Sequence, residues 1–319
     1  MQAVQVKAFG GPEVLQPVEV PAPSAKPGEV VIETAVASVL WVETMIRRTG
    51  GRPYFTVEPP YVPGNGVGGI VIAVGEGVDP GWIARAVVAH TSGTGGYAQM
   101  VAVPAEGVSV VPSGLDVADA AALLHDGVTA TAIFDRLRVA EGDRVLVLGA
   151  SGGLGIAAMQ LARCRGAQVI AAARDARKLA RLRRLGTIVD SDDADWQDRV
   201  RGAIGEADVI IDNLGGALGD AAFGLLAREG RFSAHGTASG RFANLDPTLV
   251  RERRAEVIGI GDVQLDTGTR RTLMDRILVD ASAGRIRPLI GQTWPLARAA
   301  EAHAAIEART VMGTTQLLA

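Results

Sequence analysis

The residues best suited to chemistry in this chain are the small residues of a turn with the spacing Ala150-x-Gly152-x-x-Gly155. An apolar run at residues 145–148 precedes the turn, and apolar residues at helical spacing follow it over residues 156–165. An uninterrupted apolar run is typical of a strand buried on both faces of a parallel sheet. A glycine turn between such a strand and a helix presents main-chain N–H groups at the helix N-terminus, where the dipole favours an anion. The pattern therefore predicts a turn that binds phosphate.

The spacing of this turn is that of the dinucleotide-binding fingerprint, with alanine in place of its first glycine. We therefore expect it to bind the pyrophosphate of a dinucleotide; the alternative is plain packing of a strand against a helix. The residues assigned to the cofactor here are Ser151, Gly152, Gly153, Leu154 and Gly155.

A second strand is expected over residues 169–173, and the residues after it bear on which nucleotide binds. An NAD site carries an acidic residue near this point, about 20 residues past the turn, for the ribose 2′-hydroxyl. This chain has Arg174 instead, with Lys178 close by, and arginine can bind a phosphate with two parallel hydrogen bonds. We expect NADPH, with Arg174 and Lys178 at its 2′-phosphate. Two alternatives stay open: Asp175 is the ribose acid, or the positive residues form a solvated helix face.

The middle of the chain alternates between apolar runs and helical patterns, which predicts an α/β fold with a doubly wound parallel sheet. Strands are expected at residues 145–148, 169–173, 209–211, 231–234 and 256–260, with helices at 156–165, 176–185 and 217–227. Twelve of the 15 prolines lie at or before Pro112, so the first third is expected to be short strands and loops. A helix at 269–283, a strand at 286–290, a helix at 296–308 and a strand at 314–318 are expected to follow the sheet.

Composition excludes several classes of protein. The 319 residues carry a net charge of −3, which gives no general attraction to nucleic acid or to an anionic membrane. Aromatic residues (4%) are too scarce to favour nucleic-acid binding by the basic segment 174–184. The single cysteine, Cys164, rules out an internal disulfide, and no signal peptide or apolar segment long enough to span a bilayer is recognised. We expect a soluble cytoplasmic protein.

Further motifs occur in a fixed order along nearly the whole chain. They are PGEVVI at residues 27–32, VPGNGVGGIV at 62–71, GYAQ at 96–99, AAA at 120–122, GVTA at 127–130, DVIID at 208–212, IRP at 286–288 and AAEAH at 299–303. Together with the glycine turn, these motifs resemble the medium-chain dehydrogenase/reductase superfamily, in its zinc-free, quinone oxidoreductase-like (zeta-crystallin-like) branch.

The resemblance implies a Rossmann nucleotide-binding domain at residues 122–286 and a discontinuous, β-rich GroES-like catalytic domain at residues 1–121 and 287–319. It also implies a cleft between the domains, a small-molecule substrate and a homodimer. Zinc-dependent relatives carry a cysteine near residues 39–41 and a His-Glu pair after Gly64, where this chain has Leu40 and Asn65-Gly66. The four histidines and one cysteine include no close-spaced pair, so we expect no metal.

Without a metal, the easier reaction is hydride addition to a conjugated acceptor, because conjugation spreads the developing charge onto an oxygen that hydrogen bonds can stabilise. The nicotinamide carries the hydride. We therefore expect an NADPH-dependent reductase of a quinone or an α,β-unsaturated carbonyl compound. The alternatives are an enoyl-thioester reductase of a biosynthetic pathway and a nucleotide-binding relative with little turnover.

Five more residues are assigned to the cofactor by their positions in the resemblance: Thr129, Asn213, His235, Gly236 and Val263. Thr129 lies where the family places a hydroxyl near the nicotinamide; a helix cap is the alternative. Asn213 and His235 each follow a predicted strand, at the sheet edge where ligands bind. For both residues a role within the turn is the alternative.

Two residues are proposed to be catalytic, Tyr54 and His125. Tyr54 resembles a pocket tyrosine that orients a substrate carbonyl; packing against Phe55 is the alternative. Asp126 is expected to keep the His125 imidazole charged and ready to donate a proton. The alternatives are that the two side chains form a structural hydrogen bond and that solvent supplies the proton. Glu43, near the position of a family carboxylate, is interpreted as a solvated surface residue.

Overall fold

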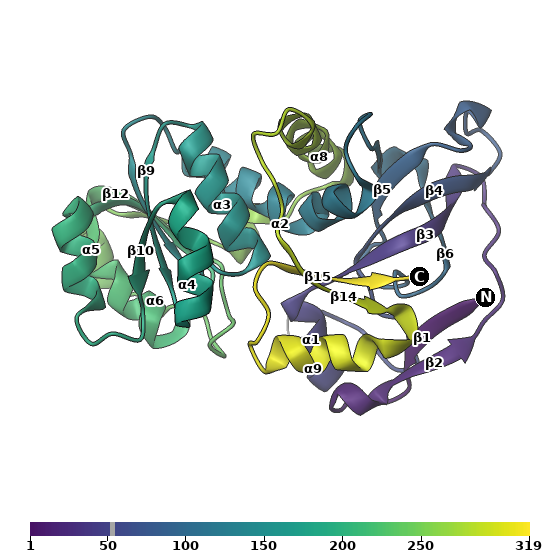
Figure 1. Ribbon diagram of the computed structural model, residues 1–319, viewed down its shortest axis with the longest axis horizontal. Coiled ribbons are helices and arrows are strands. Elements are labelled where there is room, and N and C mark those ends of the chain that lie inside the picture. Colours follow the sequence, from purple (N-terminus) through teal and green to yellow (C-terminus); the bar gives the residue numbers. More distant parts are fainter. Residues whose placement is uncertain (52–54) are drawn as a thin grey trace. The chain divides into compact units, whose positions relative to one another are not determined.

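The computed structural model describes residues 1–51 and 55–319, which divide into two compact units. The β-rich unit contains residues 1–125, 266–284 and 288–319, and the parallel-sheet unit contains residues 126–265 and 285–287. Figure 1 labels many of the helices and strands of both units. The predicted α/β fold, with a Rossmann sheet and a discontinuous β-rich domain, is confirmed.

The parallel-sheet unit is built on six strands in the order β10-β9-β8-β11-β12-β13, and every neighbouring pair is parallel. The strands are β8 Arg144–Leu148, β9 Gln168–Ala173, β10 Thr187–Asp190, β11 Ala207–Asp212, β12 Leu226–Ala234 and β13 Glu256–Gly259. The central strand β8 is buried along its apolar run, as its lack of polar alternation predicts. Its carboxyl end leads into the glycine turn.

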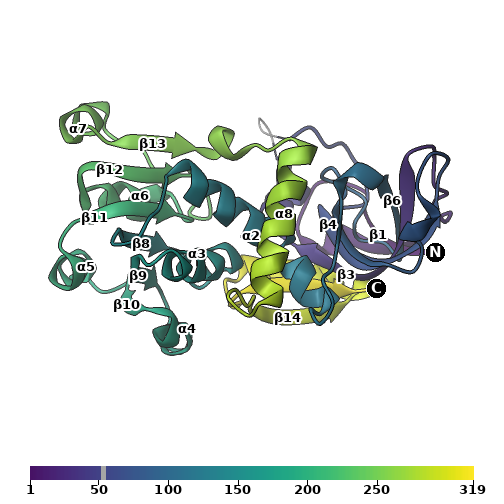
Figure 2. The same cartoon turned by 90° about the horizontal axis from the view of Figure 1, so that it is seen from above.

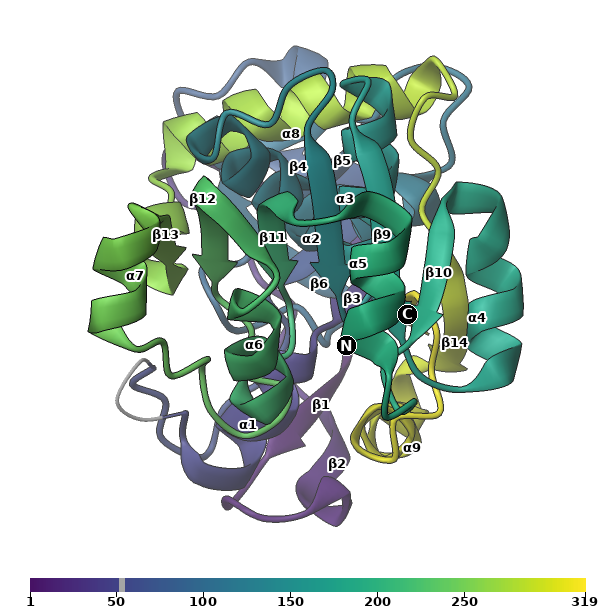
Figure 3. The same ribbon diagram turned by 90° about the vertical axis from the view of Figure 1, so that its left-hand side faces the viewer.

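Helices cover both faces of this sheet, as Figure 3 shows for α5 and α6 on one face and α3 on the other. The helices of the unit are α3 Gly153–Cys164, α4 Ala176–Leu182, α5 Trp196–Ile204, α6 Gly216–Phe223 and α7 Pro247–Arg253. Trp196, Val200 and Ile204 of α5 are buried in a core with Leu146 and Ile210 of the sheet. Burial of these apolar faces holds the strand ends in place.

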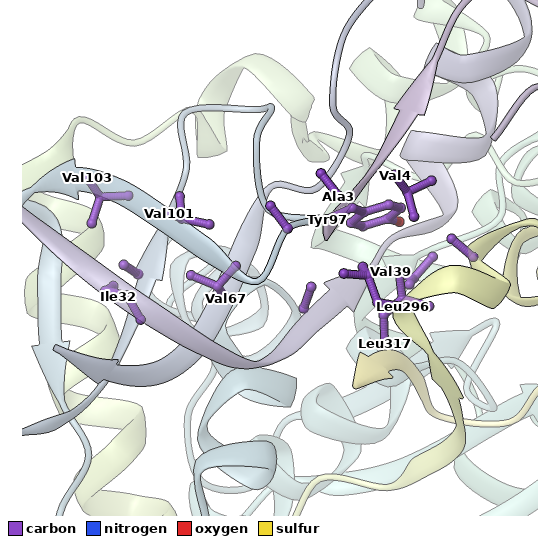
Figure 4. Packing of buried hydrophobic residues seen from close by; sticks show 14 of the residues in the cluster. Ala3, Val4, Ile32, Val39, Val67, Tyr97, Val101, Val103, Leu296 and Leu317 are labelled. Carbon is purple, nitrogen blue, oxygen red and sulfur yellow. The ribbon is translucent and has the colours of Figure 1, made fainter. Parts of the chain in front are cut away.

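The β-rich unit has a seven-stranded sheet in the order β14-β15-β3-β4-β5-β7, with β6 paired to β3, and a separate hairpin of β1 and β2. The strands are β1 Gln2–Val6, β2 Leu15–Glu19, β3 Glu29–Val39, β4 Gly66–Val74, β5 Ala86–His90, β6 Met100–Pro104, β7 Val108–Val110, β14 Ile290–Pro295 and β15 Thr314–Leu318. The core between them is made of valines and other apolar residues, including Ile32, Val67 and Leu317 (Figure 4). The C-terminal strand β15 pairs with β3, so this unit is discontinuous in sequence.

Three helices pack within the β-rich unit: α1 Trp41–Thr49, α8 Thr267–Ser282 and α9 Ala299–Glu307. Helix α1 contacts α9, and α8 contacts β7. Figure 2 labels α8, a segment that the sequence assigns to the nucleotide-binding domain. A fourth helix, α2 Val117–Arg136, contributes residues to both units. It is the one helix in the described ranges that is long and apolar enough to cross a membrane, so the sequence expectation that no segment qualifies is wrong. Since 67% of its apolar window is buried in the protein, α2 has the character of a core helix.

Two details of the chain trace differ from the sequence expectations. The strand expected at 286–290 begins instead at Ile290, because Pro288 has no N–H to donate to a ladder. The sequence does not predict the short edge strand β10, which pairs with β9. Its sequence, Thr187–Asp190, is too short to show a clear pattern.

Candidate functional site

The glycine turn lies between β8 and α3, where the sequence predicts it. Gly149 has a φ of 63°, a left-handed conformation that favours glycine. Gly155 sits so close to the turn that an added Cβ would lie 2.6 Å from Ala150 Cα and from Gly149 O. The last glycine of the motif therefore allows the close packing of helix against strand.

Gly152 has a different role in the same turn. It is the N-cap of α3, and no side chain forms a capping hydrogen bond there. An added Cβ would meet only Gly149 O, at 3.7 Å, which is an ordinary contact. The turn could therefore accept a side chain at Gly152 without strain, and glycine there leaves room for a ligand to approach the main chain. The first N–H groups of a helix have no partners within it, so Gly153, Leu154 and Gly155 offer donors to a phosphate.

At the end of β9, Arg174 and Asp175 have distinct environments. The Asp175 carboxylate caps α4 by accepting hydrogen bonds from Arg177 N at 2.8 Å and Lys178 N at 3.4 Å. The Arg174 side chain is 48% exposed, and its Nε lies 3.9 Å from Asp192 Oδ1, which is a long distance for an ion pair. Asp175 is thus already engaged as a helix cap, whereas Arg174 has freedom to meet an anion.

Three strand ends of the same sheet edge are joined by a hydrogen-bond network around Asn213 and His235. The Asn213 amide nitrogen donates to Leu148 O at 2.7 Å, and His235 Nε2 lies 2.8 Å from the Asn213 amide oxygen. His235 Nδ1 lies 2.7 Å from Ser233 Oγ. Since the Asn213 oxygen only accepts, His235 must carry its proton on Nε2 and accept from Ser233 at Nδ1. Burial lowers the pKa of His235 to about 4, so the imidazole is neutral at neutral pH.

Gly236 and Val263 complete the predicted cofactor residues of this edge. A Cβ on Gly236 would lie 2.0 Å from the Asn213 carbonyl carbon, so only glycine fits between these strand ends. Val263 is buried in the short helix Ile260–Val263, which follows β13. Thr129, in α2, is half-buried. The assignment of these residues to cofactor binding stays a prediction.

Of the two proposed catalytic residues, Tyr54 lies outside the described residues. The imidazole of His125 lies near that of His90, with ring centroids 6.3 Å apart. Burial, together with the charge of Arg270, lowers the pKa of His125 to about 4. Burial also raises the pKa of the Asp126 carboxyl to about 7. The expectation that Asp126 keeps the His125 imidazole charged is therefore wrong, while the catalytic role of His125 stays a prediction.

The interpretation of Glu43 as a solvated surface residue is also wrong. Its side chain is buried and accepts hydrogen bonds from Leu40 N, Asn65 N and the Tyr97 hydroxyl, each at 2.8 Å. Tyr97 in turn contacts His303. A glutamate at the third position of a helix can accept a hydrogen bond from the N-cap N–H, but this local pattern does not indicate burial. Tyr97 and His303 are 206 residues apart, and no local pattern links them.

Metal-ligating side chains do not gather anywhere in the part of the chain that the structure describes. No three histidine, cysteine, aspartate or glutamate residues among residues 1–51 and 55–319 lie in a group that could hold an ion. At the positions where zinc-dependent relatives carry ligands, Leu40 is the N-cap residue of α1 without a side-chain capping bond, and Asn65 donates its main-chain N–H to Glu43.

Comparison with known proteins gives consistent matches over the whole length of the chain. Residues 26–113 match the alcohol dehydrogenase GroES-like domain family, and residues 153–277 match the zinc-binding dehydrogenase family. A quinone oxidoreductase of Rattus norvegicus is 32% identical over 311 residues, which cover 95% of this chain and 93% of the rat protein.

Solved structures agree with these matches. A mycobacterial protein in complex with NADPH has a TM-score of 0.89 and 30% identity, with each chain covered completely. A protein described as an NAD-dependent alcohol dehydrogenase has a TM-score of 0.90 and 30% identity, again over both complete chains. The chain therefore belongs to the medium-chain dehydrogenase/reductase superfamily and is an oxidoreductase similar to quinone oxidoreductases.

Proposed function

We propose that this protein transfers hydride from NADPH to a quinone or an α,β-unsaturated carbonyl compound without a metal ion. The observation that carries the proposal is the cradle at the start of α3. Gly152 has no side chain, and the space that a Cβ would take is open. Main-chain N–H groups at a helix N-terminus suit the pyrophosphate of a dinucleotide.

The preference for NADPH rests on the end of β9. Asp175, the alternative ribose acid, is engaged in capping α4. Arg174 is half-exposed and has one long ionic contact, which costs little to exchange for a phosphate. The NADPH-bound mycobacterial relative supports this choice. The relative described as NAD-dependent is equally similar in sequence, so both nucleotides belong in the test.

Bound NADPH would supply the hydride, and this chain's residues bind and orient the nucleotide. The glycine turn holds the pyrophosphate, and the Leu148–Asn213–His235 network keeps three strand ends of the same sheet edge in place. Leu40 and Asn65 stand where zinc-dependent relatives carry ligands. A conjugated acceptor suits this residue set, because its developing charge spreads onto an oxygen that hydrogen bonds can stabilise. The similarity to quinone oxidoreductases supports an acceptor of this kind.

The test is a fluorescence titration of ligand-free protein with NADPH and NADH, followed by turnover with quinones, enones and enoyl thioesters. We expect tighter binding of NADPH and its oxidation by quinones or enones. Turnover with enoyl thioesters alone would favour the alternative reductase, and binding without turnover would favour a nucleotide-binding relative. Failure to bind either nucleotide would overturn the proposal. The homodimer and the cytoplasmic location are further proposals, which light scattering and cell fractionation test.

A further inference from the structure

A buried carboxylate in the β-rich unit joins the start of its own helix to two segments elsewhere in the sequence. Glu43 Oε2 accepts from Leu40 N and from the Tyr97 hydroxyl, and Oε1 accepts from Asn65 N, all at 2.8 Å. The two main-chain donors belong to the corner between β3 and α1 and to the loop before β4. The position of both segments therefore depends on the acceptor capacity of one carboxylate.

The hydroxyl of Tyr97 connects this carboxylate to a histidine of α9. Tyr97 Oη lies 2.9 Å from His303 Nε2, and the two rings meet edge to face with centroids 5.8 Å apart. Both side chains are fully buried. Figure 4 shows the Tyr97 ring among the apolar side chains of the core, where bulk water does not compete for its hydrogen bonds.

The protons of Glu43, Tyr97 and His303 can be placed in two ways without moving any heavy atom. A tyrosine hydroxyl has one proton, so when it donates to an ionised Glu43 it must accept from His303 Nε2–H. When Glu43 is protonated and donates to the Tyr97 oxygen, the hydroxyl donates instead to His303 Nε2, and the histidine proton is on Nδ1. His303 Nδ1 has no hydrogen-bond partner in the described part of the chain, so no protein group there selects one tautomer.

We propose that Glu43, Tyr97 and His303 form a proton relay that positions the main chain at Leu40 and Asn65. One proton taken up from solvent binds His303 Nδ1. The Nε2–H bond breaks as a new Tyr97 O–H bond forms, and the original Tyr97 O–H bond breaks as a Glu43 Oε2–H bond forms. The product has a neutral acid at Glu43 and a neutral histidine with its proton on Nδ1. All three residues are positioning residues, since they are enclosed in the core.

The charges around the relay favour protonation at Glu43 over a stable imidazolium. Burial raises the pKa of Glu43 to about 7, against the lowering effect of its hydrogen bonds. Burial and the charge of Arg47 lower the pKa of His303 to about 3. Among the described residues, other titratable groups that act on the relay or on Arg47 are Tyr61, Glu13, Arg48 and Glu307, of which Glu307 pairs with Arg47. The proton therefore comes to rest on the carboxylate.

Protonation of Glu43 has a structural consequence at its two main-chain partners. Hydrogen bonds to an ionised acceptor are about twice as strong as bonds between neutral groups. The bonds from Leu40 N and Asn65 N therefore weaken when the carboxylate becomes an acid. Any effect of this change on turnover rests on the proposed function, whereas the tautomer exchange itself does not.

The decisive experiment is a pH titration of the full chain by nitrogen NMR. The imidazole nitrogens report the tautomer of each histidine, and the amide signals report Leu40 and Asn65. We expect His303 to change from the Nε2–H to the Nδ1–H tautomer as pH falls through the range near 7 in which Glu43 titrates. The amides of Leu40 and Asn65 should shift with the same midpoint. His235, also buried and neutral, is the internal control and should keep its Nε2–H tautomer.

Tyr97→Phe is the matched variant, because it keeps the ring and removes the relaying hydroxyl. We expect its His303 tautomer to stop following pH, while the Leu40 and Asn65 amides still titrate with Glu43. One unchanged His303 tautomer across the titration of the wild-type protein would overturn the proposal, as would a stable imidazolium near pH 7. Coupled titration that persists in Tyr97→Phe would also overturn it. If the variant fails to fold, the wild-type titration alone decides.

Discussion

The imidazole of His235 and the side-chain amide of Asn213 are hydrogen-bonded at 2.8 Å, and this contact fixes which ring nitrogen carries the proton. The Asn213 amide nitrogen is engaged with Leu148 O, so its oxygen is the amide atom that meets His235 Nε2. Two residues that the sequence assigns to the cofactor thus bind each other and join the ends of β8, β11 and β12. This arrangement holds together the sheet edge at which we propose the nucleotide binds.

His235 should make the stability of the protein depend on pH. Its folded pKa is about 4, below the ordinary value of 6.5, so only the unfolded chain binds this proton between those values. Its contribution is complete above pH 6.5 and is lost as pH falls toward 4. We expect His235→Gln to reduce the pH slope of the unfolding free energy in this window by about 1.4 kcal/mol per pH unit. Urea unfolding at a series of pH values measures it, and identical slopes for the two proteins would contradict it.

The two glycines of the turn should separate stability from nucleotide binding. Gly155→Ala places a Cβ against Ala150 and Gly149, so we expect a loss of about 1–3 kcal/mol of unfolding free energy. Gly152→Ala meets open space, so we expect a loss below about 1 kcal/mol, as for an N-cap change. We expect its nucleotide affinity to fall at least about tenfold, or 1.4 kcal/mol, because the Cβ occupies the cradle. Thermal unfolding and nucleotide titration measure the two effects; unchanged affinity in Gly152→Ala would exclude the cradle as the phosphate site.

Arg174→Ala should change the choice of nucleotide. Loss of a charged hydrogen bond to the 2′-phosphate should weaken NADPH by about tenfold or more while NADH binding stays within about twofold. Arg183→Ala is the matched control, since Arg183 is exposed in the same positive run but lies beyond α4. Titration of all three proteins with both nucleotides decides the point. Equal losses for NADPH and NADH would remove Arg174 from the phosphate site.

Asp175 should behave as a helix cap. We expect Asp175→Ala to lower the unfolding free energy by about 1 kcal/mol, because α4 loses the acceptor for Arg177 N. Asp175→Asn keeps a capping oxygen and is expected to retain most of that stability. Neither variant should weaken NADH more than NADPH. A selective loss of NADH binding in both variants would identify Asp175 as the ribose acid instead.

The sequence predictions were correct where a feature depends on neighbouring residues and wrong where it depends on residues distant along the chain. The strand at 145–148, the glycine turn and the helix after it were predictable, because apolar runs and small residues act through their immediate neighbours. The edge strand β10 and the start of β14 were not, because a short strand depends on its pairing partner. The charge expected on His125 was wrong because burial and the charge of Arg270, a residue far along the chain, lower its pKa.

The sequence by itself determined the fold class, the superfamily resemblance and the position of the glycine turn, since each depends on local patterns in a fixed order. Only the tertiary structure decided that Glu43 is buried, that Asp175 caps a helix and that His235 binds Asn213. The physical reason is that burial and hydrogen-bond partners set the protonation and availability of a polar side chain. For Glu43 and His235 the deciding partners, Tyr97 and Asn213, come from segments that are distant along the chain.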